Sequence, residues 1–88
     1  MPITEKEMND KAYAAGILAG NAELFLEGRV PGQSGMNKLT EALEIVEQYQ
    51  MTNEEIGIYV QEVVPDASYQ VQRFITRMMR AKGVNNNG

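Results

Sequence analysis

Ser34 is the serine that stands in a glycine-rich setting, the segment Gly32–Gly35. A G-x-S-x-G nucleophile elbow would need a glycine at position 36, where this chain has Met36, and no predicted strand precedes the segment. The sequence contains no histidine and no cysteine, which removes the partners needed for Ser-His and Cys-His catalysis. The glycines from Gly28 to Gly35 also lack the G-x-x-x-x-G-K-[ST] pattern of a phosphate-binding loop. We therefore expect no enzymatic activity.

Three glutamates recur at helical spacing, Glu41, Glu44 and Glu47. Neighbouring carboxylates are the groups that paired-acid catalysis and hard metal ions require. On a helix, however, these three share one solvent-facing sector, where nothing desolvates a carboxylate or raises its pKa. The sequence also contains no D-x-[DN]-x-[DN]-G calcium loop. We expect a solvated acidic face, with no metal, no cofactor and no small-molecule substrate.

Charge is divided unevenly along the chain. Residues 1–66 contain all twelve acidic and four basic residues, a net charge of −8, whereas residues 67–88 contain three arginines, one lysine and no acid, a net charge of +4. Such a separation of charge is informative about the charge of a binding partner, and not about the fold. The apolar spacing predicts that the core side of the last helix is formed by Val71, Phe74, Ile75 and Met78. Its outward face then consists of Tyr69, Arg73, Thr76 and Arg80. Gln72 and Arg77 flank that face.

This basic face is suited to nucleic acid. Arg73, Arg77 and Arg80 would meet phosphates, while Gln72 and Thr76 would reach base edges. The alternative is that the arginines complement the C-terminal end of the helix dipole or pair with nearby acids. The prediction of a regulatory protein that contacts nucleic acid therefore depends on the arginines being open.

The segment from Thr52 to Val84 resembles the general helix-turn-helix and winged-helix pattern. Its first part matches at Thr52, Glu55, Ile56 and Gly57, and its second part matches loosely at Val71, Arg73, Ile75, Met78 and Gly83. The resemblance covers about a third of the chain and implies that the second of two helices contacts nucleic acid. The turn is long for this pattern, and no wing hairpin follows in the sequence.

The acidic part of the chain supports different functions. A net charge of −8 over residues 1–66 would be repelled by DNA unless the acidic faces point away from it. A second hypothesis is therefore an acidic interaction module or inhibitor that docks on a basic protein, including a nucleic-acid-binding one, through Glu41, Glu44 and Glu47. A third is a structural homo-oligomer that associates through an apolar stripe of the first helix. That stripe, which would otherwise be buried in the bundle, comprises Tyr13, Ile17 and Leu24 together with Gly20.

Four predicted helices position these residues. Capping boxes at Thr4 and Thr52 begin the first and third helices, and Asp66 or Ser68 caps the fourth. The loop 31–35 precedes the second helix. The first predicted helix runs from Thr4 to about Glu27, the second from about Asn37 to Tyr49, and the third from Thr52 to Pro65. The fourth runs from its cap to Lys82 and stops at Gly83.

The predicted fold is all-α, a compact bundle of about four helices in a single domain, 1–84, with a disordered tail at 85–88. The first helix has apolar residues on two sides: a broad face that includes Met8 and Leu26, and, roughly opposite, the stripe described above. We therefore expect it to be covered twice, with Gly16 and Gly20 allowing a close backbone approach. The charged first ten residues predict no signal peptide or membrane span. Because no cysteine demands an oxidising compartment, we expect a cytoplasmic protein.

Overall fold

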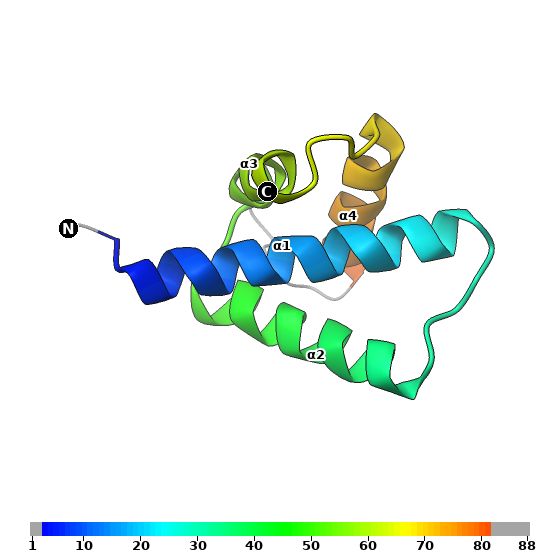
Figure 1. Cartoon of the computed structure of the whole chain (residues 1–88), viewed down its shortest axis with the longest axis horizontal. Coiled ribbons are helices and arrows are strands. Elements are labelled where there is room, and N and C mark those ends of the chain that lie inside the picture. Colours follow the sequence, from blue (N-terminus) through cyan, green and yellow to red (C-terminus); the bar gives the residue numbers. More distant parts are fainter. Residues whose placement is uncertain (1–2, 82–88) are drawn as a thin grey trace.

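Four α-helices form in the computed structural model of the chain, which describes residues 3–81 (Figure 1). No strand occurs within that range, so the prediction of an all-α, four-helix protein is confirmed. The predicted helix end at Lys82 and Gly83 and the predicted tail 85–88 lie outside the described residues. The helices are α1 (Glu5–Leu26), α2 (Gln33–Gln48), α3 (Asn53–Val63) and α4 (Tyr69–Ala81).

Side-chain oxygens begin three of these helices. Thr4, Thr52 and Ser68 each accept a hydrogen bond from the backbone N–H three residues further on, at 3.0, 3.1 and 3.2 Å. Of the two predicted caps for α4, Asp66 and Ser68, the structure uses Ser68. Each bond satisfies one of the N–H groups that a helix start leaves without a partner. The local sequence therefore sets the starts of α1, α3 and α4, as predicted.

The start of α2 differs from the prediction. The helix begins at Gln33 with Gly32 as its N-cap, so the second part of the expected loop 31–35 is helical. A side chain at Gly35 would place its Cβ 2.8 Å from the Cβ of Pro31, closer than two carbons approach. Because residue 35 is a glycine, the proline ring packs against the first turn, and the helix extends one turn further back.

Helix α1 lies at the centre of the molecule. The backbones of α2, α3 and α4 all approach it closely, with α2 on one side and α3 and α4 on another (Figure 1). The expectation that the first helix is covered twice is therefore confirmed. The residues that α1 contributes to the buried core are small or aliphatic: Ala14, Ala15, Leu18, Ala19 and Ala22.

Two residues expected on the buried face of α1, Met8 and Leu26, are instead 42% and 44% exposed. They lie near opposite ends of α1, which has 22 residues against 16 in α2, the next longest helix. A longer helix extends past those packed on it, and this leaves its end residues partly uncovered. The side chain of Leu26 consequently reaches the surface beside α4.

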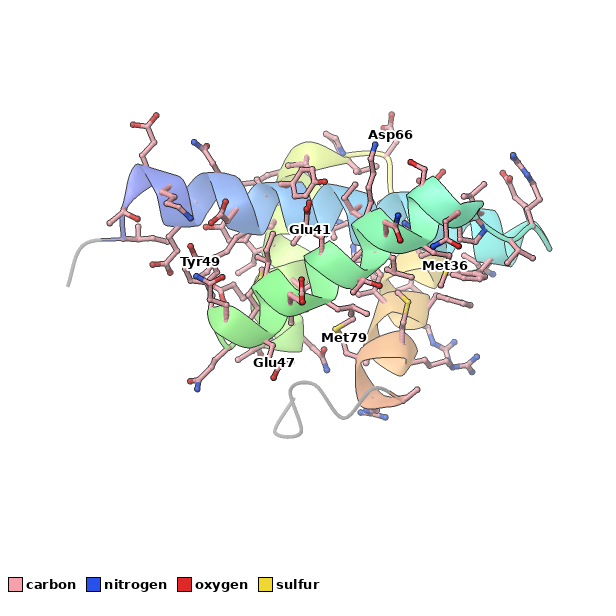
Figure 2. All side chains as sticks on the ribbon, turned by 90° about the horizontal axis from the view of Figure 1, so that it is seen from below. Met36, Glu41, Glu47, Tyr49, Asp66 and Met79 are labelled. Atoms are coloured by element: carbon pink, nitrogen blue, oxygen red, sulfur yellow. The ribbon has the colours of Figure 1, made fainter. Side chains whose placement is uncertain are left out.

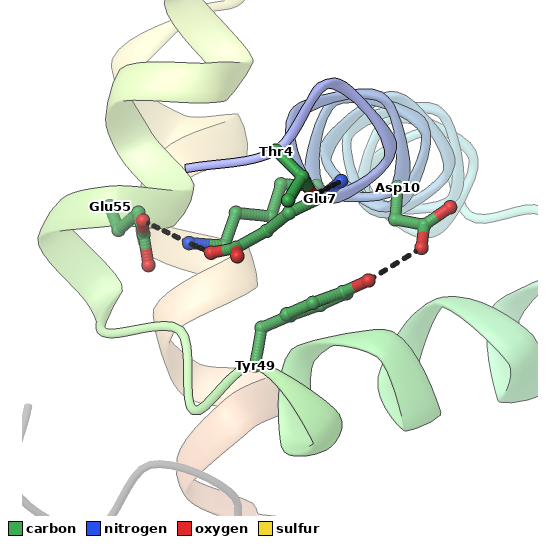
Figure 3. A network of polar contacts seen from close by, with 6 residues as sticks. Thr4, Glu7, Asp10, Tyr49 and Glu55 are labelled. Atoms are coloured by element: carbon green, nitrogen blue, oxygen red, sulfur yellow. Dashed lines mark hydrogen bonds and ion pairs between the residues drawn. The ribbon is translucent and has the colours of Figure 1, made fainter. Parts of the chain in front are cut away.

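A buried lysine joins α1 to α3. Lys11 is only 5% exposed, and its Nζ lies 2.9 Å from a carboxylate oxygen of Glu7 and 2.6 Å from one of Glu55 (Figure 3). Burial lowers the pKa of Lys11, but the hydrogen bonds to Glu55 and Glu7 outweigh that effect and leave the pKa above its usual value. These glutamates are the last residues of the two predicted capping boxes, and both reach Lys11 with their carboxylates.

Tyr49, just after α2, connects to the same region. Its hydroxyl donates a hydrogen bond of 2.8 Å to Asp10, and its ring lies 5.8 Å from Nζ of Lys11 (Figure 3). The bonds from Lys6 and then from Tyr49 hold the pKa of Asp10 below its usual value. The end of α2 is thereby attached to the beginning of α1.

Replacing Lys11 by Met tests this network, because it keeps the aliphatic stem and leaves Glu7 and Glu55 without their cation. We expect the free energy of unfolding to fall by about 1–3 kcal/mol, below the cost for a fully buried pair, because the carboxylates can rehydrate. Urea denaturation measures the change. The control Lys6→Met removes a pair whose lysine side chain is 76% exposed, and it should cost less than about 1 kcal/mol. Equal reductions in the two variants would contradict the role of Lys11.

No close backbone approach occurs at Gly20 within the described residues, although one was expected there. Gly20 is exposed, and a Cβ added there meets no atom of residues 3–81 within 4 Å. Gly20→Ala should therefore raise the free energy of unfolding by about 0.5–1 kcal/mol, because alanine is the better helix former. Gly28→Ala is the control: its φ of +78° favours glycine, and the alanine should lower stability by about 1 kcal/mol. Thermal or urea denaturation distinguishes the two, and a destabilised Gly20→Ala would refute the assignment of open space there.

Candidate nucleic-acid interface

The core side of α4 is formed by Val71, Ile75 and Met79, all at most 4% exposed. Met79 extends from α4 toward α2 (Figure 2). Phe74 and Met78, which were predicted on this side, are half-buried at its edges. The helix is thus rotated relative to the prediction, and this rotation decides which side chains face outward.

Arg73, Arg77 and Arg80 form a row along the exposed side of α4, which we call the arginine row. Between residues 3 and 81, none of the three comes within 4 Å of a carboxylate oxygen. Tyr69, at the start of the helix, is 74% exposed, and the Arg73 guanidinium lies 5.8 Å from the centre of its ring. The guanidinium groups are therefore open, which is the condition on which the nucleic-acid prediction depends.

Gln72 and Thr76 do not lie on this outward face. Both are half-buried and line a narrow crevice of about 30 Å³ against α3. The side-chain oxygen of Gln72 sits 3.5 Å from the position of a Cβ at Gly57, and the Thr76 hydroxyl donates to the backbone carbonyl of Gln72 at 3.1 Å. The prediction that Thr76 faces outward is wrong, because Met79 rather than Met78 turns into the core. The two expected readers of base edges therefore face α3.

A pocket of about 200 Å³ lies beneath the arginine row. Leu26 from the end of α1 and Phe74 from α4 provide its apolar lining, while Arg73, Arg77 and Gln70 provide the polar one. Leu26 and Phe74 were both predicted to lie in the core, so this pocket was not predicted from the sequence. The signal available was the position of Leu26 at the end of the longest predicted helix, where coverage by other helices is least.

The rings of Phe74 and Phe25 stack, with centroids 5.6 Å apart and planes inclined by 14°. This contact holds the ring of Phe74, which lines the pocket, against α1. The pocket therefore has a wall held by the packing between α1 and α4.

The acidic face predicted on α2 is exposed. Glu41, Glu44 and Glu47 are open to solvent, and within the described chain no lysine or arginine pairs with them. Figure 2 views the molecule from the α2 side and labels Glu41 and Glu47. Glu41 also raises the pKa of Tyr13 through a hydrogen bond to its hydroxyl. The predicted docking surface of the second hypothesis is thus available.

The apolar stripe of the third hypothesis is not continuous. Tyr13 is 42% exposed, but Ile17 is partly buried and packs against the core, and Leu24 is half-buried. Burial in the bundle, the competing interpretation, accounts for most of this stripe. Only Tyr13 and the exposed Gly20 remain for a partner.

The described structure adds no metal centre to these surfaces. Residues 3–81 bring together no three acidic side chains placed to hold a metal ion. The helices α1 to α4 include none that is both long and apolar enough to cross a bilayer. No protein-family model, curated protein or solved structure matches the chain. The arginine row and the acidic face of α2 are therefore the two surfaces on which a function can be argued.

Proposed function

We propose that this protein is a non-enzymatic regulatory binding protein that contacts nucleic acid. The arginine row of α4 binds the phosphate groups of the nucleic acid. The observation that carries the proposal is that Arg73, Arg77 and Arg80 are exposed and have no carboxylate within 4 Å in the part of the chain that is described. A guanidinium group binds a phosphate through two parallel hydrogen bonds, so three on one helix side make a phosphate-binding track.

The helix dipole offers a purely structural reason for arginines on α4, but it does not explain all three of them. Its effect falls off within the last turn of a helix. Arg80 is the basic residue in the last turn of α4, whereas Arg73 and Arg77 lie earlier. The dipole therefore accounts for Arg80 alone, and a ligand is the better reason for the other two.

The acidic face of α2 does not oppose this proposal. The three glutamates of α2 belong to a helix whose backbone approaches α1 closely and α4 not at all. Screening at physiological salt weakens repulsion beyond about 8 Å. A phosphate chain lying along α4 can avoid the acidic face of α2.

The salt dependence of binding tests this proposal. We expect a fluorescently labelled oligonucleotide, offered both single-stranded and as a duplex, to bind at low salt, with log K falling linearly against log [salt]. Arg73→Ala combined with Arg77→Ala should weaken binding and make that slope shallower by about 2, because each phosphate that is no longer neutralised reduces the slope on a duplex by roughly 0.9. Fluorescence anisotropy measures both quantities.

The matched control is Lys6→Ala combined with Lys38→Ala, which removes the same charge from exposed positions outside α4, with Lys6 near the end of α1 opposite to Leu26. It should lower affinity only slightly and leave the slope nearly unchanged. If neither form of the oligonucleotide binds, or if the two double variants behave alike, the arginine row is not a nucleic-acid site.

The second candidate function is docking on a basic protein through the acidic face of α2, and the exposure of its unpaired glutamates favours it. Changing Glu41, Glu44 and Glu47 to Lys should then weaken the binding of a cationic probe such as poly-lysine by at least tenfold, because attraction becomes repulsion. Isothermal titration calorimetry measures the change in affinity. The charge-matched control changes Glu23, Glu54 and Glu62 to Lys. Equal weakening in both variants would mean that net charge alone matters and that α2 is no specific surface.

A further inference from the structure

The pocket under the arginine row indicates which form of nucleic acid fits it. Leu26 and Phe74 give the pocket apolar walls, and Arg73 and Arg77 stand at the same pocket. A ligand that fills it must therefore carry negative charge next to a small flat or apolar group. A nucleotide has this combination, since its phosphate is joined to a planar base.

We propose that α4 binds single-stranded nucleic acid, with an unpaired base in the pocket and its phosphates on the arginine row. This inference rests on the proposed function and adds the class of ligand. In a duplex the bases are paired and stacked inside the helix, so only an unpaired base can enter a side pocket. The volume of about 200 Å³ is below the 300–1,000 Å³ of typical drug-sized sites, which fits one ring rather than a larger molecule.

Tyr69 supplies a second surface for a base. Its ring is 74% exposed at the start of α4, next to the guanidinium of Arg73. Proteins that bind single strands combine a basic track with exposed aromatic rings on which bases stack. Tyr69 and the arginine row together have this composition.

The surroundings of α4 do not suit duplex binding in the helix-turn-helix manner. In that geometry the first helix crosses the DNA backbone while the second reads base edges. Residues 52–68, which include α3, contain no lysine or arginine, and Glu54 and Glu62 are exposed there. The two candidate readers on α4, Gln72 and Thr76, face α3. A duplex would gain no base contact from them and would meet negative charge on α3.

Charge also gives the strand a direction. A second crevice shares Leu26 and Gln70 with the pocket, and its other walls carry three acids, Glu23, Glu27 and Asp66. Phosphates are repelled from that side. The strand therefore stays on the arginine side of α4, from Tyr69 past the pocket toward Arg80.

The experiment varies the ligand first, so that folding is not at issue. Fluorescence anisotropy at low salt compares a labelled oligothymidine, the same backbone with abasic sites in place of the bases, and a duplex of equal length. We expect the oligothymidine to bind at least tenfold more tightly than either of the others, since stacking of one base on an aromatic side chain is worth about five- to more than a hundredfold in affinity.

Variants of exposed residues then locate the bases. Tyr69→Ala and Leu26→Ala should each weaken binding of the oligothymidine several-fold and leave binding of the abasic strand unchanged. Ile3→Ala is the control, because it removes a side chain that is 42% exposed and stands before the start of α1, at the end opposite to Leu26. Circular dichroism confirms that each variant is folded before its affinity is compared.

The outcomes separate this inference from the proposed function. Equal binding of oligothymidine and abasic strand, with the arginine variants still weakened, leaves the phosphate track intact and overturns the base pocket. Tighter binding of the duplex likewise overturns it. If a peptide of alternating Glu and Phe displaces the oligothymidine at comparable concentration, the occupant is an acidic protein segment. If no nucleic acid binds, the proposed function falls as well.

Discussion

Helix α1 is buried along two sides at once, and the other helices are arranged by that constraint. Ala14, Ala15, Ala19 and Ala22 have no exposed surface, so neighbouring helices can come close to the backbone of α1. Alanine loses no side-chain entropy on burial but brings little apolar area. The larger side chains that fill the space come mostly from the partners: Val46, Met51, Ile56, Val60 and Met79, together with Leu18 of α1.

A helix lined with alanines does not by itself fix how its neighbours are placed along it. Lys11 restricts that freedom, because its two carboxylate partners must lie where the ammonium is, one on α1 and the other on α3. Tyr49 and Asp10 do the same for the end of α2. Charged hydrogen bonds are directional, unlike apolar contacts, so this cluster is suited to select one register among several of similar apolar burial.

The parts of this structure that the sequence predicts are those decided by neighbours in the chain. The caps at Thr4, Thr52 and Ser68 involve residues three apart, and all three form. The start of α2 depends on the proline ring of residue 31 fitting against Gly35, and the rotation of α4 depends on Met79 turning inward toward the rest of the bundle. Lys11 pairs with a residue 44 positions away. The exposed arginines were predictable from their spacing, but their pocket was not, because Leu26 comes from another helix.

The contrast between Lys11 and the arginine row shows how charge is distributed in the folded chain. Lys6, Lys11 and Arg29 pair with acids two to four positions away, and Lys11 gains one more from α3. No acid follows residue 66, so Arg73, Arg77 and Arg80 have no such neighbour, and Glu55 on α3 is already bound to Lys11. Like charges at positions i and i+4, such as Arg73 and Arg77, destabilise a helix by about 0.2–0.5 kcal/mol. Folding alone gains nothing from that repulsion, whereas a bound polyanion would remove it, and in this respect the arrangement of α4 supports the proposed binding of nucleic acid.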